Sequence, residues 1–155
     1  MLKPDSLRAA LTAAVPYVAQ NPDCLHIFID EGAIVSTLAP SLSFEYQYTL
    51  NLVITDYADS ADPLVVAILH WLRSHQPDIM ANPDKRDKGF TFEVDFLDNA
   101  MRDISLNLRL TERVIVREDG GTLTVSHVDE PAPPPSDLSE VEIWMAGRKV
   151  AAWRN

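Results

Sequence analysis

The sequence predicts an α+β fold: an antiparallel sheet with two long central strands, two helices packed on it, and a C-terminal β-hairpin after a Pro-rich spacer. Residues 42–55 and 104–117 alternate apolar and polar side chains, which is the period of a strand with one buried face. Residues 4–18 and 62–75 carry apolar side chains at helical spacing. Most of the expected strands follow one another closely, which favours antiparallel pairing with helices packed against the sheet.

The first long strand, LSFEYQYTLNLVIT, organises the rest of the chain. Its apolar residues fall on one parity: Leu42, Phe44, Tyr46, Tyr48, Leu50, Leu52 and Ile54. At ~3.3 Å per residue this segment spans roughly 45 Å, whereas a compact domain of this chain length is about 40 Å across. We therefore expect the strand to cross the whole domain and to bend, bulge or protrude.

The N-terminal part predicts a helix followed by a β-hairpin. Residues 4–18 form the helix, and Pro16 kinks or ends it because proline lacks an amide donor and clashes with the preceding turn. Residues 25–38 then form two short strands joined by a tight turn at Glu31-Gly32.

The central part predicts a second helix over residues 62–75, which Asp62 caps with Pro63 in its first turn. A polar, proline-containing connection covers residues 77–89 and is long for a loop inside a compact domain. Such a loop is functional or mobile. A strand over residues 90–97 follows it.

The second long strand, residues 104–117, ends at a hairpin turn marked by Asp119-Gly120-Gly121. The chain returns over residues 122–128. We therefore expect both long strands to be central in the sheet, because their lengths and alternation match.

We divide the chain into an α+β domain over residues 1–129, a Pro-rich spacer over 130–137 and a C-terminal hairpin over 138–155 that turns at Gly147-Arg148. A short hairpin is marginally stable alone, so it must dock. It covers the open sheet of its own domain or adds strands to a neighbouring chain.

Composition argues against several classes of partner and location. The net charge of −10 argues against nucleic acid as a partner, because phosphate contacts need clustered lysine and arginine. It also disfavours an anionic membrane surface, and there is no apolar run long enough to span a bilayer. The N-terminal residues lack the apolar core of a secretory signal, which predicts a cytosolic product. The single cysteine, Cys24, excludes an internal disulfide framework.

The sequence contains no catalytic or cofactor motif, so we expect no enzyme activity, no cofactor and no bound metal. The glycine-rich nucleotide signatures, the GxSxG elbow and the usual zinc spacings are all absent. One alternative is a small metal-dependent hydrolase that uses the loop from Asp56 to Asp62. That loop lacks the glycine and the terminal glutamate of a calcium site, and turn chemistry and helix capping explain its aspartates.

Two segments are candidate protein-interaction sites. The first is the charged run in the long connection, which consists of Asp84, Lys85, Arg86, Asp87 and Lys88. The second is the C-terminal hairpin, where Trp144 and Trp153 are large apolar anchors of the kind that dominate protein interfaces. A solvated loop and an ordinary core are the simpler interpretations of these residues.

Three long segments resemble one protein family. SLSFEYQYTLNLVITDY (residues 41–57), GFTFEVDFLDN (89–99) and LTERVIVREDGGTLTV (110–125) are similar to the tail completion protein R family of temperate contractile-tailed phages. IFID at residues 27–30 and the opening KPDSLRAALTAAVP are similar as well. The resemblance covers most of the chain up to about Val128.

This resemblance implies a structural role late in virion assembly, when the tail is completed and joined to a filled head. It implies a role similar to that of tail terminator proteins, which form a hexameric ring on the tail tube. The implied partners are the tail tube protein and neck or head-completion proteins, in the host cytoplasm during assembly and then in the virion tail. A neck or baseplate component is the other structural alternative. The resemblance carries over no catalytic residues.

Overall fold

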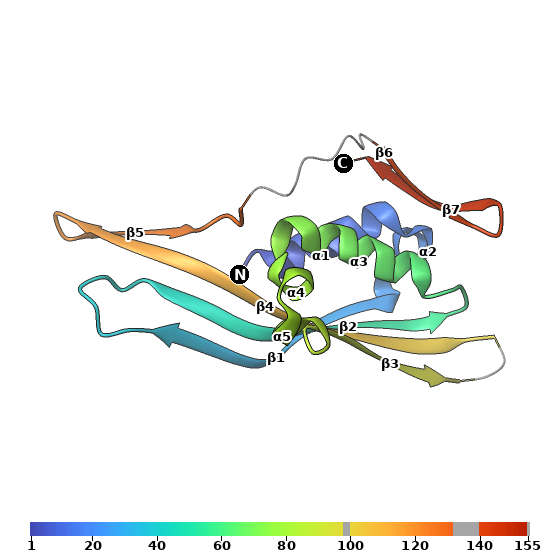
Figure 1. Cartoon of the computed structure of the whole chain (residues 1–155), viewed down its shortest axis with the longest axis horizontal. Helices are drawn as coiled ribbons and strands as arrows, with labels where there is room; N and C mark the ends of the chain where they lie inside the picture. Colours follow the sequence, from blue (N-terminus) through green and yellow to red (C-terminus); the bar gives the residue numbers. More distant parts are fainter. Residues whose placement is uncertain (98–99, 132–139, 155) are drawn as a thin grey trace.

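The fold is a five-stranded antiparallel sheet with helices on one face and a separate two-stranded hairpin (Figure 1). The computed structural model describes residues 1–97, 100–131 and 140–154. The strands of the main sheet are β1 (Leu25–Ser36), β2 (Phe44–Tyr57), β3 (Phe90–Phe96), β4 (Arg102–Asp119) and β5 (Thr122–His127). Their order is β1-β2-β4-β3, and β5 pairs with the C-terminal part of β4. The predicted α+β class is confirmed, and the two long strands are central in the sheet.

Helices cover one part of one sheet face. They are α1 (Lys3–Ala14), α2 (Pro16–Gln20), a 3-10 turn η1 (Pro22–Cys24), α3 (Asp62–His75), α4 (Asp78–Ala81) and α5 (Pro83–Arg86). Helices α1 and α3 bury their apolar stripes against the even-numbered residues of β2 and β4. The central core residues include Leu7, Leu11, Leu50, Leu52, Ile54, Leu64, Ile68, Leu72, Ile104, Leu106 and Leu108. This burial is the main source of stability.

Two helix boundaries test the predicted local signals. The prediction for Pro16 is confirmed, because α1 ends at Ala14 and α2 begins at Pro16 after an extended Val15. The prediction that Asp62 caps α3 is wrong. Ala61 occupies the cap position without a side-chain hydrogen bond, and Asp62 is the first helical residue. Its carboxylate still lies in the first turn, where the helix dipole favours negative charge.

The predicted hairpin over residues 25–38 is wrong. Strand β1 is continuous, and its residues on both sides of Glu31 pair with β2. Glu31 and Gly32 form a bulge between Asp30 and Ala33, with Glu31 at a positive φ of 52°. A bulge inserts an extra residue without reversing the chain, and β2 is long enough to pair with both halves of β1.

A second bulge in β2 places Tyr57 in the core. The pairing of β2 with β4 shifts between Ile54 and Tyr57, and Asp56 has a positive φ of 55°. The extra residue changes the side-chain parity, so Ile54 and Tyr57 both face the helices. The rings of Tyr17 and Tyr57 pack edge to face, with centroids 4.9 Å apart. Burial is the main reason that the pKa of Tyr57 rises to about 12.

The C-terminal hairpin consists of β6 (Glu140–Met145) and β7 (Arg148–Arg154). Its turn residues are Ala146 and Gly147, both with positive φ, and not Gly147-Arg148 as predicted. In the structure the hairpin lies over the helices and not on the open sheet, and β7 contacts α1 (Figure 1). Residues 132–137 of the predicted spacer, and 138–139 and 155 of the predicted hairpin, lie outside the described residues.

Replacing Leu50 by aspartate should abolish cooperative folding. Leu50 is completely buried between β2 and the helices, so an unpaired carboxylate there costs several kcal/mol. Gln47→Asp is the matched control, because Gln47 is exposed on the same strand. Circular dichroism melting curves compare the two variants. A cooperative Leu50→Asp transition close to that of the control would contradict this assignment of the core.

Candidate functional site: a protein interaction surface

The geometry offers no catalytic centre at the loop from Asp56 to Asp62. Asp56 lies in the β2 bulge, where its backbone amide donates to Asp103 Oδ1 at 3.0 Å. Asp62 lies in the first turn of α3. Among the described residues, no cluster of three or more histidine, cysteine, aspartate or glutamate side chains is arranged to hold a metal ion. The hydrolase alternative therefore has no support in this loop.

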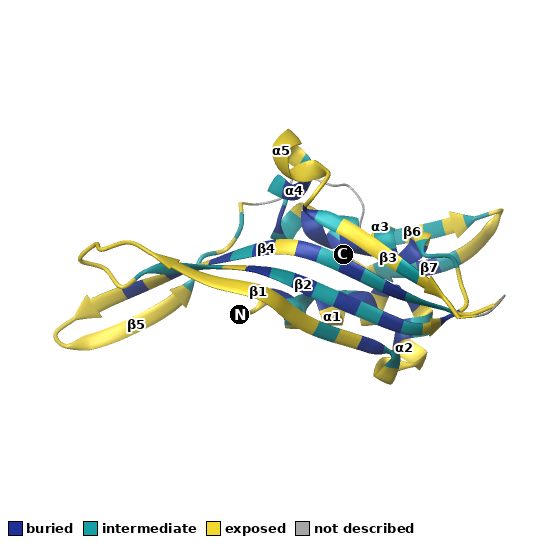
Figure 2. Ribbon diagram, turned by 90° about the horizontal axis from the view of Figure 1, so that it is seen from below, coloured by how far each residue is buried: buried dark blue, intermediate teal, exposed yellow. Residues whose placement is uncertain are grey.

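The most distinctive surface is the part of the sheet that extends beyond the helices, which we call the sheet extension. It comprises residues 33–45 of β1, β2 and their loop, together with residues 113–127 of β4 and β5. Figure 1 shows it as two hairpins that project past the N-terminus of α1. Figure 2 shows that most of its surface is exposed. The expectation that the long strand protrudes is met here.

Apolar side chains are exposed on the sheet extension. Ile34 is 69% exposed, Leu123 52% and Val125 61%, and all three lie on the face that carries the helices elsewhere. Val35 and Ile115 are exposed on the opposite face. Exposed apolar side chains grouped on strands in this way are typical of a protein-binding surface.

A buried carboxylate marks the boundary between the core and the sheet extension. Glu112 is only 5% exposed and follows Leu110 on the apolar parity of β4. It accepts hydrogen bonds from the Tyr48 hydroxyl at 2.5 Å and from the Leu2 amide at 2.7 Å. His127 Nδ1 of β5 lies 3.4 Å from Oε2, the oxygen that also accepts from the Leu2 amide. Glu112 thus joins the N-terminus, β2, β4 and β5 at one point.

A buried lysine supports the same region. Lys3 Nζ donates to Gln76 Oε1 at 2.7 Å and to the Thr111 carbonyl at 2.8 Å. It also pairs with Glu130 at 2.9 Å, so the start of α1 holds the segment that follows β5. Gln76 in turn accepts from the Thr111 amide at 3.1 Å.

Hydrogen bonding decides the ionisation of Glu112. Burial raises the pKa of its carboxyl group, but hydrogen bonds from Tyr48 and from the Leu2 and Lys3 amides outweigh burial and lower the pKa below its ordinary value of 4.5. Burial, followed by the bond to Glu112, raises the pKa of Tyr48, so its hydroxyl stays a donor.

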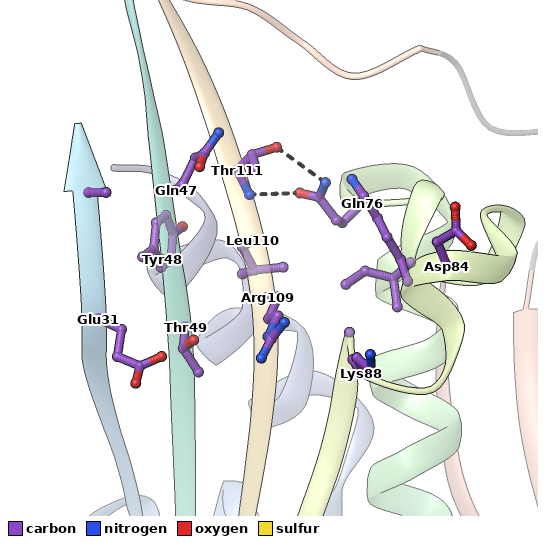
Figure 3. A pocket seen from close by; sticks show the side chains of 14 residues that line it. Glu31, Gln47, Tyr48, Thr49, Gln76, Asp84, Lys88, Arg109, Leu110 and Thr111 are labelled. Carbon is purple, nitrogen blue, oxygen red and sulfur yellow. Dashed lines mark hydrogen bonds between the residues drawn. The ribbon is translucent and has the colours of Figure 1, made fainter. Parts of the chain in front are cut away.

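The predicted charged run lies on α5 and the turn after it, at the sheet edge between β3 and β5. Lys85 pairs with Asp78, and Arg86 Nε donates to the Met80 carbonyl at 3.1 Å. Asp84 and Lys88 line an open cleft of about 440 Å³ together with Glu31, Gln76, Arg109 and Thr111 (Figure 3). This cleft mixes both charge signs and suits polar contact with a protein. That the run is an interface stays a prediction.

Gly89 permits close packing of the α4–α5 segment next to the start of β3. A Cβ atom at residue 89 would lie 2.8 Å from the Lys85 carbonyl oxygen and 2.9 Å from Ile79 Cγ2. The glycine therefore allows the α4–α5 segment to pack tightly before β3 begins.

The two hairpin tryptophans have different environments. Trp153 packs against the core and meets the His70 ring edge-on, with centroids 5.4 Å apart. Trp144 is 59% exposed, and its indole N–H donates to Glu142 at 2.9 Å. The structure does not bring Trp144 together with the charged run. Trp153 is an anchor within the chain, whereas Trp144 remains an interface candidate.

Sequence reasoning missed Glu112, Lys3 and the exposed apolar residues of the sheet extension. Glu112 carries a readable signal, because it is the single charged residue on the apolar parity of the strand predicted over residues 104–117. The exposure of Ile34 and Val125 carries no such signal, since both belong to ordinary strand patterns.

Comparison with known proteins decides the family. The P2 phage tail completion protein R (GpR) family matches residues 1–131. The chain belongs to this family. It is 50% identical to the Tail completion protein R of Escherichia phage P2 over 153 residues, which cover 99% of each chain. No solved structure matches.

Family membership gives the protein a structural role in completing the phage tail, as the resemblance implied. The family match ends at the start of the proline-rich segment, so the C-terminal hairpin lies beyond it, although the phage P2 protein is similar over that part too. Within the described residues, none of the helices is long and apolar enough to cross a membrane.

Replacing Glu112 by glutamine should lower stability at neutral pH by about 1.5–3 kcal/mol, the usual range for hydrogen bonds to a charged group. Because folding lowers the pKa of Glu112, its contribution is complete above about pH 4.5 and is lost as the pH falls through the lowered value. The urea unfolding midpoints of wild type and variant should therefore converge in acid.

Glu118→Gln is the control for this experiment, because Glu118 is exposed on the same strand. Its difference from wild type should be small at every pH. A constant difference between Glu112→Gln and wild type from pH 7 to pH 3 would show that the carboxylate charge is not what stabilises this junction.

Proposed function

We propose that this protein completes the tail as a ring of several copies at one end of the tail tube, where it supports joining to the head. Its own contacts, and not catalysis, carry this function. The resemblance to tail terminator proteins favours six copies. The partners are the tail tube protein and neck or head-completion proteins, and assembly takes place in the host cytoplasm.

The sheet extension is the observation that carries this proposal. It exposes strand edges and apolar side chains on both faces, and none of the described helices covers it. A monomer that exposed such a surface permanently would risk aggregation. A ring buries strand edges when each copy uses one edge to bind the next. The net charge of −10 limits association of free copies at low salt.

The C-terminal hairpin and the charged run Asp84–Lys88 serve other contacts in this proposal. Trp144 projects from the hairpin with most of its surface exposed, which suits an anchor in a partner's pocket. The domain over residues 1–129 then forms the ring body, and the spacer and hairpin act as a separate contact element.

Labelled protein should be found at a single end of assembled tails. The measurement is electron microscopy of tails completed with gold-labelled full-length chain, compared with tails assembled without it. Label at the end that meets the head supports the proposal. Label along the tube would reject the ring, and label at the baseplate end would favour the baseplate alternative.

Trp144→Ala should leave the free energy of unfolding within about 0.5 kcal/mol of wild type, as for other exposed positions, but reduce tail completion. Trp153→Ala is the matched control, and it should destabilise the protein because Trp153 packs on the core. Thermal melting and the yield of infectious particles are measured for both. Full completion by a folded Trp144→Ala variant would remove Trp144 from the interface.

A further inference from the structure

We propose that copies in the ring exchange their C-terminal hairpins, so that the hairpin of one copy docks on the helices of the next. The receiving surface is the outer face of α1 and α3 around His70, which we call the hairpin seat. Its occupant in the ring is therefore a second copy of this chain. This inference rests on the proposed function and deepens it, because it names a contact that links neighbouring copies.

The structure shows which element fits the hairpin seat. Strand β7 contacts α1, and Trp153 packs against the core and meets the His70 ring edge-on, with centroids 5.4 Å apart. Ala151 of the same strand is only 3% exposed. Every copy carries the same seat and the same hairpin, so the contact that forms within one chain can form equally between two chains.

The hairpin can leave its seat without breaking polar contacts. Between the described residues of the hairpin and those of the domain there is no hydrogen bond or ion pair. Glu142 accepts hydrogen bonds from Trp144 and Lys149 of the hairpin itself. Strands β6 and β7 pair only with each other. Apolar and aromatic contact therefore holds the hairpin, and it re-forms in full on a second copy.

The contact within one chain is incomplete at the turn of the hairpin. An open cleft of about 770 Å³ lies between the turn region, residues 145–150, and Pro16 and Tyr17 of the domain. Well-packed interiors contain few voids larger than a water molecule. The docking contact is therefore concentrated around Ala151 and Trp153, and we expect its release to cost much less than unfolding of the domain.

The connection is long enough for exchange. Residues 132–139 join Pro131, which follows β5, to Glu140 at the start of β6. An extended chain advances by at most about 3.5 Å per residue, so β6 can begin about 30 Å from Pro131. A neighbouring copy whose seat lies within that reach can receive the hairpin.

Local concentration decides between the two arrangements, because both use the same contacts. A hairpin on a short tether meets its own seat at an effective concentration of about millimolar. Free copies are more dilute, and the net charge of −10 opposes their association at low salt, so each free hairpin fills its own seat. Copies held side by side at the tail end bring neighbouring seats into the same range. Exchange then ties the copies together where the tail is completed.

Photo-crosslinking between isotopically distinct copies tests the exchange. Trp153→p-benzoylphenylalanine keeps an aromatic ring at the anchor and crosslinks it to the surface that it contacts. This variant is mixed with a large excess of isotope-labelled wild-type chain, and the mixture completes tails before irradiation. Most crosslinked peptides from α1 and α3 should then carry the label, because most neighbouring seats belong to labelled copies. In the same mixture free in solution, these peptides should be unlabelled.

Trp144→p-benzoylphenylalanine is the matched control, because Trp144 is 59% exposed on the other strand of the same hairpin. Its crosslinks should not include peptides of the seat. Thermal melting shows whether each variant folds. If the Trp153 variant melts early, His70→p-benzoylphenylalanine gives the reciprocal test from the seat, and the crosslinked hairpin peptides should then carry the label on tails.

Unlabelled crosslinked peptides on tails would show that each hairpin stays on its own copy, and they would overturn the inference. Loss of the seat crosslink on tails, when the free protein gives one, would overturn it as well. Both results leave the proposed function standing. Wild-type label away from the tail end would reject the proposed function itself.

Discussion

The pairing of β2 with β4 is the constraint on which the rest of the structure depends. The two strands remain in register from Phe44 opposite Val114 to Ile54 opposite Ile104, and after a bulge Tyr57 meets Arg102. Their even-numbered side chains form one face that is apolar except at Glu112, and α1 and α3 cover only part of it. A sheet longer than its helices must extend beyond them, and this surplus length creates the surface that the protein offers to partners.

Glu112 lies between the part of β4 that belongs to the core and the part that belongs to the sheet extension. Before Glu112 in the chain, β4 contributes leucines and an isoleucine to the apolar core. After Glu112, the strand enters the sheet extension. A buried carboxylate is expensive unless hydrogen bonds satisfy it, and here Tyr48 and the N-terminal amides do so. The cost is met by directional contacts, so the N-terminus, β2 and β5 are fixed relative to one another at the base of the extension.

The protein combines exposed apolar side chains on the sheet extension with a high net negative charge. The net charge of −10 opposes association of free copies at low salt. Exposed apolar surface together with net charge suits a structural role in tail completion, because assembly must occur at a defined place and not in free solution. The bulge at Glu31 adds to it, since bulges twist an edge strand and discourage indiscriminate pairing.

The sequence by itself determined the α+β class, both long strands, the helix break at Pro16 and the hairpin after Asp119, because alternation, proline and glycine act locally. It also determined the family, through the resemblance of long segments. Only the tertiary structure decided that Glu31 lies in a bulge and not in a turn, since a continuous partner strand, remote in sequence, holds both halves of β1. It also decided which strand residues stay exposed. Ile34 and Leu50 lie in similarly apolar strand patterns, but the helices cover Leu50 and leave Ile34 exposed. How far the helices reach along the sheet is not encoded in the local sequence of either strand.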